Sequence, residues 1–276
     1  TSLRPGARSS FDRDVVAAAI RGARLRNPLM EDSIFEFARD VLFPEPGDES
    51  TAPDTEAAER LRFAMSMQQF TAPVQAKGIE DTALYIYNRL TSLNEVGSQP
   101  DHFGVSPDAL HAWLAGRATQ WPYGLSASST HDAKRSEDVR ARLNVLSELP
   151  GAWKQAISAW ARINGRGRSV LDGQSYPSRN EEYLLYQTLL GTWPLEGMTS
   201  EQEGQYRERI AAYMHKAMRE AKLFTSWVNP SPTHESAMAR FVEFVLAPEN
   251  TPFRNEFLAF QRRIAVYGLY NSLAQV

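Results

Sequence analysis

A cluster of ionisable side chains lies between residues 130 and 137, in the segment THDAKRSE. His131 and Asp132 stand side by side, and the cations Lys134 and Arg135 follow them closely. Imidazoles and carboxylates beside cations are the groups that acid–base catalysis and charge stabilisation require. Polar residues of these types also cap helices, because their side chains accept hydrogen bonds from the first free backbone amides. The residues alone leave both a catalytic site and a helix cap open.

The residues on either side of this cluster predict how it is held. Residues 124–129 are small or apolar and predict a buried strand, whereas Val139, Leu143 and Leu146 recur at helical spacing. The cluster would then be the polar tip between a strand and a helix. Barrels of alternating strands and helices place catalytic side chains at such tips, because the strand holds them rigidly while the loop leaves them open to substrate.

A second polar tip, KGIED, begins at Lys77 and contains Glu80 and Asp81. Residues 74–76 before it predict a second short strand, and Tyr85 follows on a predicted helix. Charged groups make strong hydrogen bonds to sugar hydroxyls, and an aromatic ring packs on the apolar face of a pyranose. A surface loop that leads into a capped helix explains the same residues equally well.

A third candidate is the TSWVNP loop, which carries Trp227 and Asn229 between two predicted helices. An exposed tryptophan beside an amide is a common platform for a sugar ring, although a buried anchor is equally consistent with the residues. His102 and His111 lack a partner at metal-ligand spacing. We therefore predict no metal site and no cofactor.

The composition argues against several other functions. The net charge is −3 and basic residues form no extended stripe, so we expect no nucleic-acid partner. No apolar run reaches the roughly 18 residues of a membrane helix, and the first residues lack an apolar signal core, so we expect no membrane partner. The chain contains no cysteine, which is compatible with a reducing compartment, and we expect a cytoplasmic protein.

Most of the remaining chain shows the 3.6-residue apolar periodicity of amphipathic helices. The predicted helices cover residues 12–26, 33–42, 56–69, 106–114, 153–163, 181–190, 201–223, 236–246 and 253–273. Residues 164–180, rich in glycine and arginine, interrupt this pattern and predict a mobile excursion.

Several long segments resemble one enzyme family. THDAKRSEDVRARLNVLSE from Thr130, QQFTAPVQAKGIEDTALYIYNRLTSLNEVG from Gln68, NEEYLLYQTLLGTWP and TSWVNP are similar to stretches of the maltooligosyl trehalose synthases. These enzymes belong to the α-amylase superfamily, in which a His-Asp pair ends the seventh barrel strand. The resemblance covers most of residues 60–276 and maps that pair onto His131 and Asp132.

The resemblance implies an activity and a role for each candidate residue. Such enzymes convert the reducing-end α-1,4 bond of a maltodextrin into an α,α-1,1 bond by retaining glycosyl transfer. Asp132 would stabilise developing positive charge and His131 would hydrogen-bond the same sugar, making these two the catalytic candidates. The substrate-binding candidates, which would contact a maltooligosaccharide, are Lys77, Glu80, Asp81, Tyr85, Lys134, Arg135, Trp227 and Asn229.

The resemblance also implies a fragment of a larger enzyme. No stretch resembles the superfamily's nucleophilic aspartate or acid/base glutamate, so we expect the chain alone to be inactive. We predict a mainly α fold with about two strand–helix units of an incomplete (β/α)8 barrel. The predicted parts are a helical insertion region (1–70), a barrel-derived segment with both polar tips (71–146) and a helical region (147–276).

Two other functions fit parts of this pattern. One is a different hydrolase or transferase of the α-amylase superfamily that shares the His-Asp pair. The other is a helical carbohydrate-binding or interaction module without catalysis. Product analysis of a full-length enzyme distinguishes the first from a trehalose-forming activity.

A truncated barrel should also associate with itself, because a cut core exposes large apolar patches. We therefore expect the sedimentation coefficient of this chain to rise with protein concentration in analytical ultracentrifugation. A monomeric profile at high concentration would contradict this expectation.

Overall fold

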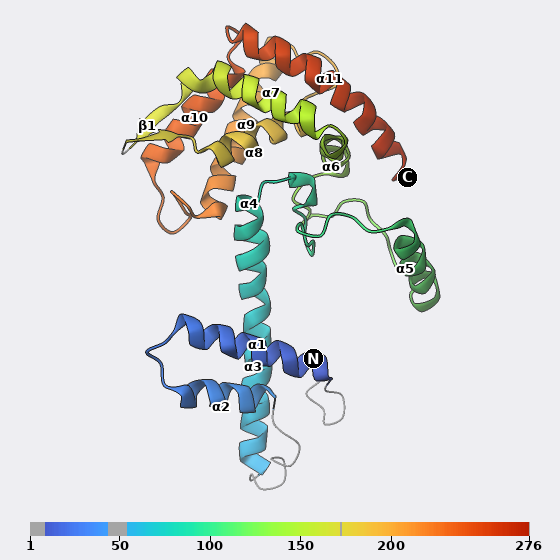
Figure 1. The fold of residues 1–276 in the computed structure, drawn as a ribbon, viewed down its shortest axis with the longest axis vertical. Helices are drawn as coiled ribbons and strands as arrows, with labels where there is room; N and C mark the ends of the chain where they lie inside the picture. Colours follow the sequence, from blue (N-terminus) through green and yellow to red (C-terminus); the bar gives the residue numbers. More distant parts are fainter. Residues whose placement is uncertain (1–8, 44–53, 172, 276) are drawn as a thin grey trace. The chain divides into compact units, whose positions relative to one another are not determined.

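The computed structural model describes residues 9–43, 54–171 and 173–275. Two compact units divide the chain, an N-terminal unit of Thr1–Ala76 and a C-terminal unit of Lys77–Val276. Helices dominate the described part of both units (Figure 1), so the prediction of a mainly α chain is confirmed. None of the described helices combines the length and the apolar character needed to cross a membrane.

The described part of the N-terminal unit is built from α1 (Ser10–Arg26), α2 (Asp32–Leu42) and α3 (Asp54–Gly78), which ends just beyond the unit boundary. Ser9 and Asp12 cap α1 reciprocally, since each side chain accepts a hydrogen bond from the other residue's amide. The Phe37 and Phe63 rings, with centroids 6.2 Å apart, join α2 to α3. The predicted boundary after residue 70 falls inside α3, as does the boundary between the units.

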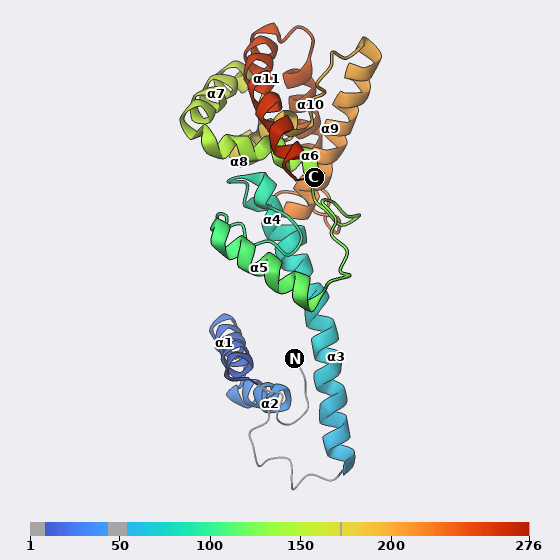
Figure 2. The same ribbon diagram turned by 90° about the vertical axis from the view of Figure 1, so that its right-hand side faces the viewer.

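The C-terminal unit contains most of the helices, and Figure 2 shows them from a second direction. Its α-helices are α4 (Leu84–Ile86), α5 (Pro107–Gln120), α6 (Glu137–Asn144), α7 (Pro150–Ile163), α8 (Arg179–Thr192), α9 (Ser200–Ala221), α10 (Pro232–Leu246) and α11 (Thr251–Leu273). Its short turns are the π-helical η2 (Ile79–Ala83) and the 3₁₀ segments η3 (Thr91–Leu93), η4 (Val145–Glu148) and η5 (Asn164–Gly167).

Helix α8 forms the centre of the C-terminal unit. It packs against α6, α7 and α9, while α11 lies across α6 and α7. Leu185, Leu189 and Leu190 of α8 are fully buried. Trp160 of α7 packs its ring against Tyr186 of α8, with 5.4 Å between ring centroids. Burying side chains of this size supplies most of the stability of such a core.

Polar side chains of α8 also bind the irregular segment that precedes α5. The buried Gln187 amide donates to the Asn88 carbonyl at 2.8 Å, and its oxygen accepts from the Thr91 amide at 2.9 Å. Asn180 and Tyr183 donate to the carbonyls of Ile86 and Arg89. Buried backbone groups outside regular elements need such partners, so α8 fixes the course of residues 86–91.

Both strands that the sequence predicts beside the polar tips are wrong. Val74–Ala76 continues α3, and residues 124–129 are irregular and mostly exposed, with Leu125 98% exposed. A strand needs a neighbouring strand to pair its backbone groups, whereas a helix pairs them internally. In the described chain the sheet contains only two strands, and neither lies at these positions.

Those two strands occur where a mobile excursion is predicted. β1 (Ser169–Leu171) pairs antiparallel with β2 (Gln174–Tyr176), so residues 164–180 contain a defined hairpin. Gly173 adopts a φ of 78° in its turn, a conformation that glycine reaches without a Cβ clash. The buried Tyr176 side chain then anchors the hairpin to the core.

A glycine allows α11 to cross α6 at close range. A Cβ added at Gly268 would lie 2.8 Å from the Cα of Arg142, a backbone atom that cannot move away alone. We expect Gly268→Ala to lower the free energy of unfolding by about 1–3 kcal/mol through overpacking. Gly204→Ala in α9, where the added Cβ meets nothing within 4 Å, is the control and should be neutral or stabilising. Urea unfolding followed by tryptophan fluorescence measures both, and equal effects would contradict the close crossing.

Candidate functional site

The two predicted polar tips meet at the carboxylate of Asp81. Lys77 donates to one carboxylate oxygen at 2.6 Å, and Lys134 donates to the other at 2.7 Å. Hydrogen bonds from Lys134 and then Lys77 lower the pKa of Asp81, although its partial burial opposes the shift. The fold therefore brings three predicted sugar-binding residues into one charged cluster, which we call the Asp81 cluster.

The π-helical turn η2 orients the first part of this cluster. Lys77 and Asp81 are four residues apart, so their side chains lie on the same side of the helix. Thr82 accepts a hydrogen bond from Lys222 at the end of α9, which ties η2 to that helix. Glu80 accepts the Gly97 amide at 3.1 Å, so this predicted sugar ligand holds a backbone turn in the structure.

A carboxylate that the sequence analysis missed holds the second part. Glu95 accepts the amides of Lys134 and Arg135 and a hydrogen bond from the Arg140 guanidinium at 2.9 Å. Burial works to raise the pKa of Glu95, but the amides of Lys134 and Val96 together with Arg140 outweigh it and lower the pKa. The sequence gives little sign of this role, since Glu95 is a single acid in the connector NEVG. Its partners lie about forty residues further along the chain, where local patterns do not reveal them.

Arg135 and Tyr85 lie beside the cluster, Arg135 through hydrogen bonds of its guanidinium and Tyr85 through its ring. The Arg135 guanidinium donates to the Tyr213 hydroxyl at 2.8 Å and to the Thr91 carbonyl at 3.1 Å. The Lys134 ammonium lies 5.5 Å from the centre of the Tyr85 ring, and burial raises the pKa of this tyrosine. The Tyr213 side chain packs against the hydrophobic core, and its hydroxyl takes part in this polar network.

The His-Asp pair lies outside the network. The side chains of His131 and Asp132 are 91% and 72% exposed, with 3.6 Å between imidazole Nε2 and carboxylate Oδ2. In the described residues no hydrogen bond joins either side chain to the Asp81 cluster. Glu95 fixes the backbone at residues 134–135, only two positions beyond Asp132. These hydrogen bonds therefore restrict the position of the His-Asp pair on the surface.

Trp227 and Asn229 lie in the loop between α9 and α10. Trp227 is 53% exposed, and its indole N–H donates to Glu220 of α9 at 3.1 Å. The backbone amide of Asn229 donates to the Ser226 hydroxyl at 2.9 Å, which closes a tight turn that contains Trp227. Helix α9 thus carries partners of both the Asp81 cluster and the tryptophan loop.

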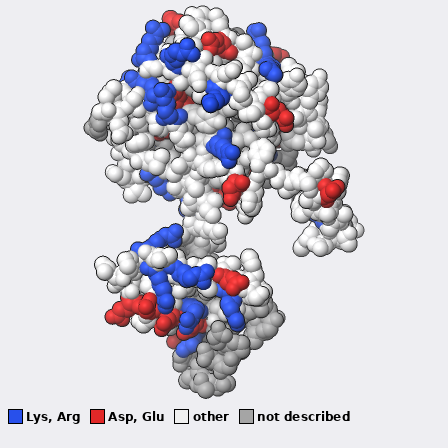
Figure 3. Space-filling model, viewed as in Figure 1, with Lys and Arg blue, Asp and Glu red and all other residues white. Residues whose placement is uncertain are grey.

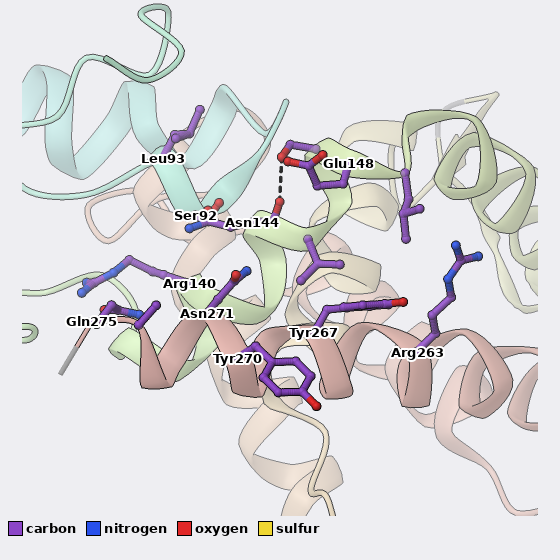
Figure 4. Close-up of a pocket in the computed structure, with 14 residues that line it drawn as sticks. Ser92, Leu93, Arg140, Asn144, Glu148, Arg263, Tyr267, Tyr270, Asn271 and Gln275 are labelled. Carbon is purple, nitrogen blue, oxygen red and sulfur yellow. Dashed lines mark hydrogen bonds between the residues drawn. The ribbon is translucent and has the colours of Figure 1, made fainter. Parts of the chain in front are cut away.

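Two cavities lie away from these residues. One of about 750 Å³ is lined by η3, α6, η4 and α11, with Arg140, Tyr267, Tyr270 and Asn271 on its wall (Figure 4). Another of about 590 Å³ is lined partly by Trp153 of α7. None of the predicted site residues lines either cavity. The candidate sugar contacts therefore lie outside both cavities. On the face of the C-terminal unit drawn in Figure 3, acidic and basic side chains are scattered among uncharged ones.

The described residues contain no group of three or more histidine, aspartate or glutamate side chains placed to hold a metal ion. The Lys77 and Lys134 ammonium groups and the Asp81 carboxylate provide the Asp81 cluster with hydrogen-bonding groups and charge. Lysine ammonium and aspartate groups in this arrangement bind neutral hydroxyls through charge-assisted hydrogen bonds.

The sequence and fold are both similar to those of one kind of enzyme. Proteins from two strains of Mycobacterium tuberculosis, named as maltooligosyl trehalose synthases, are 39% identical over 183 residues, which cover 66% of this chain. The chain spans only about a fifth (22%) of the length of these curated relatives. No protein-family profile matches the sequence.

Solved structures with similar folds carry the same name. The crystal structure of a maltooligosyl trehalose synthase matches 96% of this chain with a TM-score of 0.70 and 33% identity, and 35% of its own chain is covered. The maltooligosyltrehalose synthase from Arthrobacter ramosus matches 95% of this chain with a TM-score of 0.71 and 31% identity, and 30% of its own chain is covered.

The charge pairing at Asp81 predicts a pH-dependent contribution to stability. We expect Asp81→Asn to lower the free energy of unfolding at pH 7 by about 1 kcal/mol, because two charge-assisted hydrogen bonds lose their anion. The folded-state pKa of Asp81 is lowered, so this contribution is present above the unfolded pKa of about 4 and is lost as the pH falls through the folded value.

Urea unfolding of wild type and variant at pH 7 and pH 3 measures this contribution. All six tryptophans lie in the C-terminal unit, so their fluorescence reports on the unit that contains Asp81. Asp101→Asn, at an exposed position, is the control. A difference between wild type and Asp81→Asn that is as large at pH 3 as at pH 7 would show that charge does not cause it.

Proposed function

We propose that this chain, a homologue of part of the maltooligosyl trehalose synthases, forms part of the sugar-binding surface of a trehalose-forming enzyme. The observation that carries the proposal is the meeting of Lys77, Asp81 and Lys134 in one cluster, because these residues come from the two segments that resemble the family's active cleft. The similarity in sequence and in fold supports the same assignment from independent comparisons.

The proposed activity is that of a (1→4)-α-D-glucan 1-α-D-glucosylmutase. In the whole enzyme a carboxylate attacks the anomeric carbon while a carboxylic acid protonates the leaving oxygen, giving a glycosyl-enzyme intermediate. The released glucose then turns and attacks through its own anomeric hydroxyl, which forms the α,α-1,1 bond. Neither carboxylate of this step matches a stretch of the present chain, so the chain contributes binding and orientation of the sugar.

In this scheme the His-Asp pair acts at the reacting sugar. Asp132 stabilises the positive charge of the oxocarbenium-like transition state, and His131 hydrogen-bonds the same ring. A preorganised charge of this kind contributes several kcal/mol, or about 10²-fold in rate. Glu95 serves the pair indirectly, because it binds the two amides directly after it.

The Asp81 cluster would bind sugar hydroxyls further along the substrate. Lys77 is 73% exposed at its side chain, so its ammonium keeps donors available beyond the bond to Asp81. Lys134 is 13% exposed and serves mainly to hold Asp81 in place. The acceptor oxygens of Asp81 and the free donors of Lys77 match the alternating donor and acceptor character of glucose hydroxyls.

Calorimetric titration with maltohexaose tests the proposal. We expect this chain to bind the sugar, Lys77→Ala to weaken the binding about tenfold, and the chain alone to form no trehalose-terminated product. Lys216→Ala, which removes an exposed lysine from α9, should leave the affinity unchanged.

Absence of binding by the wild-type chain would contradict the proposed sugar surface. Formation of a non-reducing, trehalose-terminated product by the chain alone would contradict the assignment of both reacting carboxylates to other parts of the enzyme.

A further inference from the structure

The carboxylate of Glu235, near the start of α10, is the acceptor for three side chains. Arg219 of α9 binds it through two parallel hydrogen bonds of 2.8 and 2.9 Å. The Thr225 hydroxyl donates at 2.6 Å, and His215 Nε2 lies 2.8 Å from the second oxygen. Bidentate arginine–carboxylate pairs restrict both partners to one geometry, so Arg219 is held in a single orientation.

Arg219 in turn lies over the ring of Trp227. Its guanidinium carbon is 4.9 Å from the ring centre, within the range of a cation–π contact. The indole N–H donates to Glu220, the residue after Arg219, at 3.1 Å. The tryptophan is therefore held on one face and at one edge, yet it remains 53% exposed.

Glu235 also fixes the loop from which Trp227 projects. Thr225 is 3% exposed, and its hydroxyl both donates to Glu235 and accepts the Ser231 amide at 2.8 Å. Between these two residues the Ser226 amide donates to the Asn229 carbonyl at 3.1 Å. The Glu235 carboxylate thus holds the Arg219 guanidinium over the indole and also binds Thr225, two residues before Trp227.

We infer that Arg219 and Glu235 are positioning residues that hold Trp227 as a preformed stacking platform for a glucose ring of an α-1,4-glucan. The inference rests on the proposed function, which supplies the class of sugar. Because Arg219 occupies one face of the indole, the sugar packs on the opposite face through its C–H groups. A side chain held before binding loses little conformational entropy when the sugar arrives.

The platform belongs to the same surface as the Asp81 cluster. Lys222, which ends α9 with a left-handed φ of 57°, donates to Thr82 of η2 at 2.7 Å. The pKa of Lys77 is raised chiefly by its hydrogen bond to Asp81, and the charge of Glu220, which accepts the indole N–H of Trp227, adds to the shift. The C-terminal end of α9 thus holds both Trp227 and the turn η2 that carries Asp81.

An ion pair that only joins α9 to α10 would give similar stability effects, so the test needs a readout at Trp227 itself. We would label the chain with 5-fluorotryptophan and record ¹⁹F NMR spectra with and without maltohexaose. Trp227→Phe identifies the Trp227 resonance among the six tryptophans, and Trp160, buried in the core, reports on folding.

We expect Glu235→Gln to shift or broaden the Trp227 resonance, to leave the Trp160 resonance in place, and to weaken maltohexaose binding about threefold to tenfold. Trp227→Ala should weaken binding about tenfold. Glu243→Gln is the matched control, because Glu243 on α10 pairs with Arg207 on α9 at 3.3 Å. It removes an ion pair between the same helices and should leave the Trp227 resonance and the affinity unchanged.

Several outcomes would overturn the inference. An unchanged Trp227 resonance and affinity in Glu235→Gln would show that the ion pair does not position the ring. If Glu235→Gln loses the Trp160 resonance through unfolding, Arg219→Lys decides instead, because lysine keeps the charge but lacks the planar fork. That variant should still move the Trp227 resonance, and an unmoved resonance would contradict the role of Arg219.

The sugar titration separates this inference from the proposed function. If maltohexaose shifts other resonances but Trp227→Ala binds normally, the platform is wrong while the sugar surface stands. If calorimetry detects no maltohexaose binding by the wild-type chain, the proposed function fails together with the platform. The sugar-free spectra then still decide whether Arg219 and Glu235 hold the ring.

Discussion

The arrangement of the candidate site depends on one buried amide, that of Gln187. This side chain is fully buried in α8 and uses both ends of its amide on the backbone of Asn88 and Thr91. Without such partners, the irregular backbone between η2 and α5 would bury unpaired polar groups at a cost of roughly 1–3 kcal/mol each. Because the amide is itself inside the core, the segment that carries Asp81 and Glu95 is fastened to α8, the helix at the centre of the unit.

Charged hydrogen bonds then add to the hold of the buried Gln187 amide on this segment. Asp81 and Glu95 lie at the two ends of residues 81–95 and bind Lys134, Arg135 and Arg140, which come from a different part of the chain. The network joins the segment of η2 and η3 to the start of α6 and the residues directly before it. It leaves His131 and Asp132 exposed, so the pair is tethered at its C-terminal side while its side chains face solvent.

The tryptophan loop is held in the same way at the C-terminal end of α9. A carboxylate with several donors fixes Arg219 and Thr225, and these fix the ring and the loop of Trp227. In both places an acid that would not contact the sugar fixes the segment from which a candidate sugar-binding residue projects. This division explains why Glu95 and Glu235 escaped the sequence analysis, which searched for groups with chemistry of their own.

The sequence by itself determined the helices and their inward faces, because both depend on neighbours three or four residues away, such as Leu185 and Leu189. It also identified Lys77, Asp81 and Lys134 as candidates through their types and their resemblance to a family. Only the tertiary structure decided that these three meet, that residues 74–76 are helical and that residues 124–129 form no strand. A strand and a charge cluster both depend on partners distant in the chain, and local residue patterns contain no information about which distant groups come together.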